Sequence, residues 1–227
     1  MTQKYLRMIV YKWVLLVIVA ILANGCALTT DYVDFEYIPE AGVSKVDGAD
    51  FVEVSVKLTD VRTTKDKVSC KKNGFGMEMA AIISKDDVTT LVANAIENEL
   101  RNRGFKITEG SVQVDIELNK FYNDFKVGLV SGSTTSEVIM TVRVKDLDGN
   151  INYAKCVTGL HTIGVMLFTG KNTKISLEVA LKDAVSKLMH DSSFIAALVK
   201  EAELDPELIE QVEDKYPHLL EEPKSEE

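Results

Sequence analysis

The chain has 227 residues, of which 46% are hydrophobic, so it is long enough to form one domain with a substantial core. Its formal net charge of −9 argues against nucleic acids and anionic lipid surfaces as partners. Three of its basic residues lie in the signal described next, so the remainder is more acidic still.

The first 25 residues have the pattern of an export signal. Lys4, Arg7 and Lys12 precede an apolar run of 11 residues, 13–23. A membrane-spanning helix needs about 20 apolar residues, so this run is too short to cross a bilayer. A short apolar core behind basic residues is typical of a cleaved signal peptide. An uncleaved anchor over residues 5–23 is the alternative.

Cys26 follows the signal directly, after Gly25. Here the chain resembles the lipobox of bacterial lipoproteins, in which the cysteine is acylated and becomes the mature N-terminus. The resemblance implies that Cys26 anchors the chain to a membrane, durably if it carries two or three acyl chains. In lipoproteins, an aspartate after the cysteine favours retention in the inner membrane. Ala27 stands there instead, which implies the outer membrane, facing the periplasm.

The two remaining cysteines, Cys70 and Cys156, lie in a compartment that permits disulfides. They could pair, or they could stay independent thiols with one of them buried. The second alternative is favoured, because neither cysteine has a metal-type or CxxC spacing.

Three segments follow the signal. Residues 26–50 predict a tether, and the alternation of Val33, Phe35 and Tyr37 with acidic residues predicts that part of it lies along a sheet edge. Residues 51–200 predict the folded domain. Residues 201–227 carry eleven acidic and two basic residues, which predicts a disordered or weakly helical tail.

Within the domain, the first half alternates between strands and one helix. Residues 51–59 predict a strand, 60–73 a long basic connection, and 77–84 a short strand or extended run. A helix is expected next, with Ser84 as its cap and Asp87 three residues on, ending at Gly104.

Strands dominate the second half. The expected elements are a short extended piece at 105–108, strands at 111–119, 137–145 and 150–162, a loop at 124–135, and helices at 175–189 and 192–200. The alternation breaks at Lys120-Phe121, which predicts a bulge or a strand end. Asp148-Gly149 predicts a hairpin turn.

This order predicts an α+β fold. We expect a two-layer sandwich, in which a mostly antiparallel sheet of about four to five strands carries two helices on one face. The crossover through the first helix should place its flanking strands parallel.

No catalytic constellation is found in the sequence. His161, His190 and His218 lie far apart without ligand-like neighbours, so no metal is expected. An S-x-x-K match at residues 69–72 and a Gly-Lys pair at 170–171 lack the companion residues of their motifs. We therefore expect a protein that is not an enzyme and has no cofactor.

Two features are candidate partner surfaces. The first is a basic cluster of Lys65, Lys67, Lys71 and Lys72 in an acidic chain, for which a solvated loop is the alternative. The second is the apolar segment with Ile163, Val165, Met166, Leu167 and Phe168, for which core packing is the alternative.

Several short motifs in residues 52–198 support a family resemblance. They are Asp60-Val61-Arg62, Asn73-Gly74-Phe75-Gly76-Met77-Glu78, Leu100-Arg101-Asn102-Arg103-Gly104-Phe105, Leu188-Met189-His190-Asp191 and Phe194-Ile195. With the signal, this combination resembles the YajG family of uncharacterised bacterial lipoproteins. The resemblance implies the address and the fold, and it transfers no catalytic residue.

Two functional hypotheses follow. The first is a non-enzymatic lipoprotein that is held at the membrane through its lipid anchor and binds or scaffolds another envelope protein. The second is an accessory lipoprotein in lipopolysaccharide or phospholipid transport, which predicts an open apolar groove between the sheet and the helices.

Overall fold

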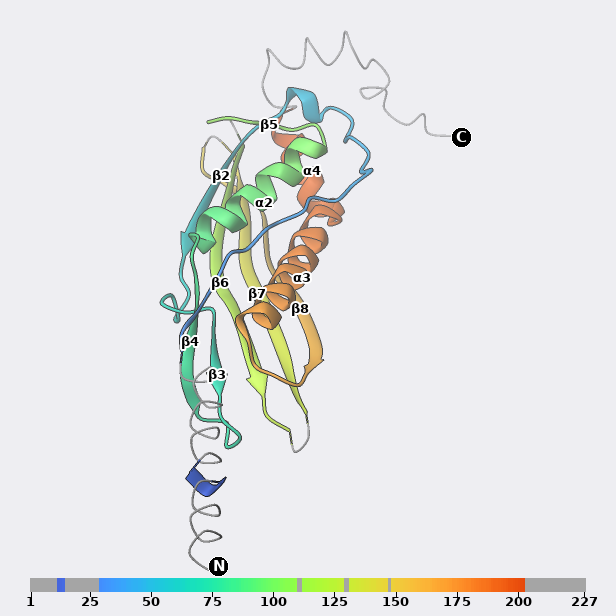
Figure 1. Ribbon diagram of the computed structural model, residues 1–227. Coiled ribbons are helices and arrows are strands. Elements are labelled where there is room, and N and C mark those ends of the chain that lie inside the picture. The colour runs from blue at the N-terminus through green and yellow to red at the C-terminus, as the bar shows by residue number, and fades with distance from the viewer. Residues whose placement is uncertain (1–11, 15–28, 110–111, 129–130, 147, 203–227) are drawn as a thin grey trace, which may run out of the picture.

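The computed structural model describes residues 12–14, 29–109, 112–128, 131–146 and 148–202. Cys26, nearly all of the predicted signal peptide and the acidic tail beyond residue 202 lie outside the described residues (Figure 1). Within the described ranges, no helix is both long enough and apolar enough to cross a membrane.

Eight strands and three longer helices make up the described fold. In chain order they are β1 (Asp31–Val33), the short 3-10 helix η2 (Ala49–Phe51), β2 (Glu53–Asp60), β3 (Ser69–Lys72), β4 (Glu78–Ser84), α2 (Val88–Asn102), β5 (Lys106–Ile107), β6 (Val112–Lys126), β7 (Gly132–Lys145), β8 (Ile151–Val165), α3 (Gly170–Met189) and α4 (Ser192–Ala202). The predicted α+β class is confirmed. The sheet is larger than the four to five strands expected, and α4 is a third main helix.

The long strand β6 organises the sheet. One edge of β6 pairs with β7 antiparallel, and β8 continues the sheet beyond β7. The other edge carries two parallel strands in succession, β2 along the first half and β3 at Asn123. A bulge between Leu118 and Lys120 separates them, where the sequence predicts a break in alternation. The sheet is therefore mixed rather than mostly antiparallel.

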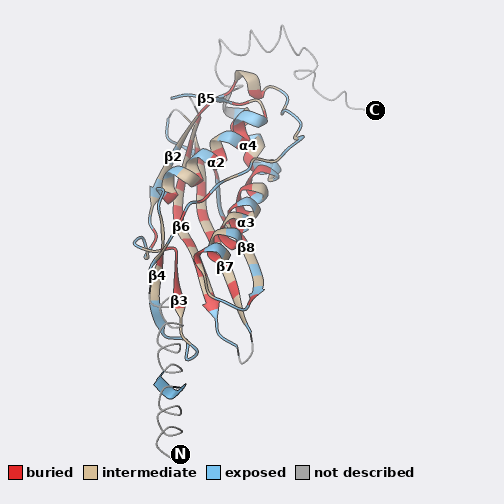
Figure 2. Ribbon diagram, viewed as in Figure 1, coloured by how far each residue is buried: buried red, intermediate tan, exposed pale blue. Residues whose placement is uncertain are grey.

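The three helices cover one face of this sheet (Figure 1). Buried residues alternate along β6 and β7 and join those of the helices in one core (Figure 2). α3 lies directly against β8 at Gly159, where an added Cβ would lie 2.0 Å from the carbonyl oxygen of Ala180. Glycine is needed there because the two backbones touch.

The helix ends differ in part from those predicted. Asp87, rather than Ser84, caps α2, because its side chain accepts a hydrogen bond of 3.0 Å from the Thr89 backbone N–H, whereas Ser84 ends β4. The stop at Gly104 is confirmed, since its φ of +102° suits glycine. α3 begins five residues earlier than predicted, at Gly170, because Thr169 caps it.

Two segments expected to lack regular structure belong partly to the sheet. The basic connection 60–73 contains β3, and β6, which ends at Lys126, and β7, which begins at Gly132, both extend into the loop expected at 124–135. The segment predicted as a tether also packs on the fold from Thr29 onward. β1 pairs with β4, which confirms the expected sheet-edge contact, and Phe35 packs edge-on against Phe121 with ring centroids 5.4 Å apart.

Candidate functional site

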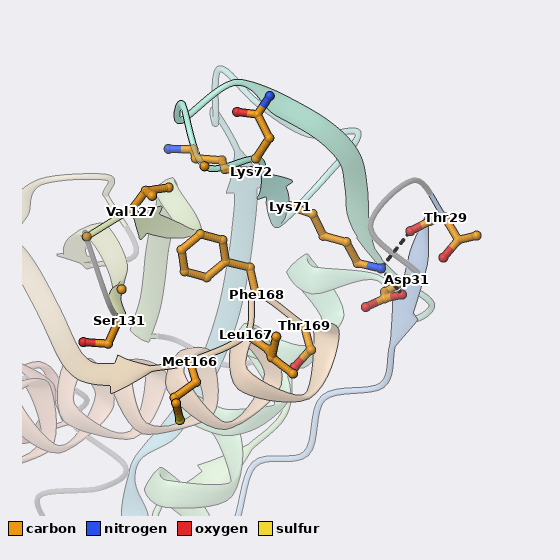
Figure 3. Close-up of a pocket in the computed structure, with 14 residues that line it drawn as sticks. Thr29, Asp31, Lys71, Lys72, Val127, Ser131, Met166, Leu167, Phe168 and Thr169 are labelled. Atoms are coloured by element: carbon orange, nitrogen blue, oxygen red, sulfur yellow. Dashed lines mark hydrogen bonds and ion pairs between the residues drawn. The ribbon is translucent and has the colours of Figure 1, made fainter. Parts of the chain in front are cut away.

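Three connections and the N-terminal segment surround a cleft of about 530 Å³ at one end of the sheet. Its lining comes from residues 29–31, from the end of β3 and the turn after it, from the β6–β7 connection and from residues 166–169 between β8 and α3. We call this hollow the end cleft (Figure 3).

Phe168 forms the apolar part of the cleft. Its ring stacks on Phe125 with centroids 4.6 Å apart and an interplanar angle of 25°. The ring also lies against Gly132, where an added Cβ would come within 2.6 Å of it. These contacts fix the connection between β8 and α3 over the ends of β6 and β7.

An ion pair ties the N-terminal segment to the cleft. The buried Lys71 donates hydrogen bonds from its Nζ to Asp31 Oδ1 at 2.8 Å and to the Thr29 carbonyl oxygen at 2.9 Å (Figure 3). The second oxygen of Asp31 accepts from the Gly170 N–H at 2.8 Å, at the start of α3. This carboxylate is favourably placed, because a helix N-terminus attracts negative charge. It links three elements that are distant in sequence.

Exposed apolar side chains lie beside the cleft, at the β3–β4 turn and between β8 and α3. Asn73 shapes the β3–β4 turn, since its side-chain oxygen accepts from the N–H groups of Phe75 and Met77, both at 3.0 Å. Phe75 is 91% exposed, Met166 84% and Leu167 71%, the three highest values among the large hydrophobic residues that the structure describes.

Each lysine of the predicted basic cluster has its own partner. Besides Lys71, these pairs are Lys65 with the Asp60 carbonyl oxygen at 2.7 Å, Lys67 with Glu78 at 2.6 Å and Lys72 with Asp124 at 2.6 Å. Lys65 and Lys67 border a different hollow beside Arg62. The four lysines therefore do not form one free cationic patch, and only Lys71 and Lys72 reach the end cleft.

The residues of the predicted apolar segment also fall into two groups, those that line the end cleft and those that do not. Met166, Leu167 and Phe168 line the end cleft, whereas Val165 is buried and Ile163 packs against the core. The sequence analysis therefore identified five residues of the end cleft but missed Thr29 and Asp31 there, and it missed the exposed Phe75 at an adjoining hollow. A usable signal for Phe75 was its position as a large apolar residue between two glycines.

The two cysteines are separate free thiols, Cys70 buried on β3 and Cys156 exposed on β8. The structure therefore has the favoured alternative of independent thiols. Burial raises the pKa of Cys70, which keeps the thiol protonated. Cys70 is consequently a poor nucleophile at neutral pH.

The remaining polar groups give little support for a reactive centre. His161 contacts Ser176 at 3.2 Å and His190 contacts Ser186 at 3.3 Å, each a local pair with a serine of α3. In the part of the chain that the structure describes, no group of three His, Cys, Asp or Glu side chains could hold a metal ion. The end cleft is lined by hydroxyl, amide, paired charged and apolar groups.

A second surface is the free edge of β8, which we call the β8 edge. Among the described strands, β8 pairs only with β7 along its 15 residues. Side chains of α3 cover the middle of this edge: Asp183 accepts from the Leu160 N–H at 2.9 Å, and Lys187 donates to the Thr158 carbonyl oxygen at 3.0 Å. The backbone N–H and C=O groups of a strand alternate in direction from residue to residue. Those of Cys156 and Thr162 therefore point away from β7, as those of Thr158 and Leu160 do.

Comparison with known proteins gives a family and a set of similar structures. The model of Lipoprotein_16, described as "Uncharacterized lipoprotein", matches residues 39–199. No curated protein matches the chain. A protein from Xanthomonas campestris of known structure is 12% identical with a TM-score of 0.49, covering 76% of this chain and 97% of that one. A minor lipoprotein from Acinetobacter baumannii is 9% identical with a TM-score of 0.42, covering 63% and 93%.

Proposed function

Because this chain belongs to the family of uncharacterized lipoproteins, we propose that it is a lipid-anchored envelope protein that binds or scaffolds a second envelope protein. We assign the anchor to Cys26. Ala27 after the cysteine supports the outer membrane, with the domain facing the periplasm. Within the family, the motifs at residues 73–78 and 100–105 support kinship with YajG.

The β8 edge is the observation that carries this proposal. Exposed edge strands offer unpaired backbone groups to other chains, and proteins usually keep such strands short or covered. The other edge strands here are short, with three residues in β1 and two in β5. β8 is far longer, and side chains of α3 bond its backbone at Thr158, Leu160 and, more weakly at 3.5 Å, at His161. An extended segment of a partner could add to this edge as a further strand.

The alternative role in lipopolysaccharide or phospholipid transport has less support. It predicts an open apolar groove between the sheet and the helices. In the described residues that space is filled, since Val114 and Met140 of the sheet and Leu177 and Leu181 of α3 are almost fully buried in one core. The end cleft lies beyond this core, and charged or polar residues form much of its lining. This favours protein binding over lipid carriage.

Photo-crosslinking in intact cells tests the proposal. A photoreactive amino acid replaces Leu160, which is 50% exposed on β8, or Val179, which is 42% exposed on α3 and serves as the control. We expect one protein to be captured repeatedly from position 160 and not from position 179. Equal capture at both positions, or none at position 160, would contradict strand addition at β8.

A backbone variant separates strand addition from a side-chain contact. Thr162→Pro removes an outward-pointing N–H, and it leaves the N–H groups that bond β7 in place. We expect this variant to lose the crosslink from position 160, while Thr162→Val keeps it. Persistence of the crosslink in Thr162→Pro would argue for a contact through side chains alone.

A further inference from the structure

We propose that the rim of the end cleft inserts into the surface of the lipid bilayer that holds the anchor. The rim consists of Phe75, Met77, Val127, Met166 and Leu167. This proposal rests on the anchor at Cys26, but it does not depend on a protein partner at the β8 edge.

The first argument is the exposure of these side chains. Phe75, Met166 and Leu167 have the highest exposed fractions of the large hydrophobic residues in the described chain, and Met77 and Val127 are also exposed. A cluster of exposed apolar side chains marks a contact with another apolar surface.

The second argument is that the rim residues lie together although they come from three connections. Val127, Met166 and Leu167 line the end cleft, and Phe75 and Val127 line an adjoining hollow that shares Lys72 and Gly74 with it. Figure 1 shows the β3–β4 turn and the ends of β6 and β8 at the same end of the sheet. The rim can therefore meet one surface at once.

The third argument identifies that surface. Only residues 27 and 28 lie between Cys26 and Thr29, which the Lys71 Nζ holds at the end cleft. An extended chain spans at most about 3.6 Å per residue, so Cys26 lies within about 11 Å of Thr29. The polar region of one leaflet is only about 5–7 Å thick. This short connection therefore keeps the end cleft beside the bilayer, whereas the rest of the sheet extends away from the bilayer.

The charge of the chain and of the residues beside the rim indicates which lipids the rim contacts. The chain is acidic overall, which disfavours attraction to anionic lipids. The rim itself is flanked by the exposed Lys126 and Lys171, whose long side chains can keep their charge at headgroup level while apolar neighbours go deeper. Insertion should consequently rely on the apolar side chains and occur with neutral lipids.

The test uses tryptophan fluorescence of the mature, acylated protein, which begins at Cys26, in phosphatidylcholine vesicles with brominated acyl chains, which quench a nearby indole. Trp13 is the single tryptophan and lies in the predicted signal, so the mature chain has none. Phe75→Trp and Leu167→Trp place a probe on two rim connections. Ile151→Trp is the matched control, 53% exposed at the opposite end of β8 from Val165.

We expect both rim variants to shift their emission to shorter wavelength and to lose most of their intensity to the brominated lipid, while Ile151→Trp changes little. The proposal would be overturned if Phe75→Trp and Leu167→Trp were quenched no more than Ile151→Trp. That result would also be expected if the rim contacts a protein instead of lipid. A mass spectrum without acyl groups on Cys26 would also overturn the proposal. The crosslink from position 160 is scored separately, so failure at the rim leaves the partner proposal standing.

Discussion

Two buried polar clusters near opposite ends of the sheet are built in different ways. Away from the end cleft, the C-terminal turn of α2 lies near β5 (Figure 1). Here lies the Glu99 cluster, formed by Tyr37, Glu40, Glu99 and Arg103. Near the cleft, where β3 meets β6, lies the Asn123 cluster, formed by Ser69, Asn123, Thr134, Ser136 and Thr173. The first cluster contains a buried ion pair, and the second contains only amide and hydroxyl groups.

The Glu99 cluster fastens the N-terminal segment to α2. Arg103 donates to Glu99 Oε2 at 2.5 Å, and the Tyr37 hydroxyl and the Glu40 N–H both donate to Glu99 Oε1 at 2.7 Å. Burial alone would raise the pKa of Glu99. The hydrogen bonds from Tyr37, from the Glu40 N–H and from Arg103 outweigh burial and hold the pKa below its usual range.

The Asn123 cluster fastens β3, β7 and α3 to β6 beneath the cleft. The Asn123 amide donates to Ser69 at 3.1 Å and to Thr173 at 3.3 Å, and its oxygen accepts from Ser136 at 2.8 Å and from Thr134. Every polar atom of the Asn123 side chain is thereby bonded. The comparison teaches that the Glu99 cluster should lose more stability than the Asn123 cluster when one member is removed, and that of these two clusters only the Glu99 cluster should respond to pH.

The largest effect is expected from Arg103→Ala. It leaves the Glu99 carboxylate buried without its counter-ion, which typically costs about 3–5 kcal/mol of the free energy of unfolding. Urea unfolding of the purified protein, followed by circular dichroism, measures the loss.

Arg101→Ala is the matched control for this variant. Arg101 pairs with Glu97 on the exposed side of the same helix, where such a pair contributes at most about 1 kcal/mol. If Arg103→Ala lowered the free energy of unfolding no more than Arg101→Ala, the Glu99 cluster would not fasten the N-terminal segment to α2 as described above.

A smaller loss is expected from Asn123→Ala, about 2–3 kcal/mol, because buried hydroxyl groups of Thr134 and Ser136 lose their acceptor without leaving a charge behind. Asn119→Ala, on the same strand, removes one partly buried bond from Thr141 and should cost about 1 kcal/mol. Equal losses in the two variants would mean that the neutral cluster does not act as a unit.

These clusters also show where sequence reasoning works and where it stops. α2 and the apolar half of β6 follow from alternation or helical spacing, because local periodicity decides which side chains face the core. The second half of β6 was missed because the alternation shifts its phase at the bulge between Leu118 and Lys120. Asn123, which faces inward as a polar residue, also hides the apolar pattern there. β3 has no alternating apolar pattern, and its pairing with β6 at Asn123 and the Lys71–Asp31 ion pair depend on residues far away in sequence.

The end cleft was predictable to a similar extent. Its lysines and its apolar segment stood out as unusual in composition, but nothing local indicates that Asp31 bonds both Lys71 and Gly170. That convergence arises from tertiary packing.

The smallest effect is expected from Tyr37→Phe, about 1.5 kcal/mol, because one hydrogen bond to a charged acceptor is lost. The control is Tyr122→Phe, which removes only a weak contact of 3.6 Å with the Cys70 sulfur and should be nearly neutral.

The Glu99 cluster is tested most directly by how the difference in unfolding free energy between wild type and Tyr37→Phe depends on pH. A carboxyl group whose pKa is lowered in the folded state contributes stability above its unfolded pKa, and this contribution is lost as the pH falls through the folded pKa. Without the Tyr37 hydroxyl, the pKa of Glu99 is lowered less, so the variant has less of this contribution to lose. The difference in unfolding free energy between wild type and Tyr37→Phe should therefore be largest near neutral pH and shrink on acidification. A difference that stayed constant from neutral to acid pH would mean that Tyr37 acts through packing rather than through the charge of Glu99.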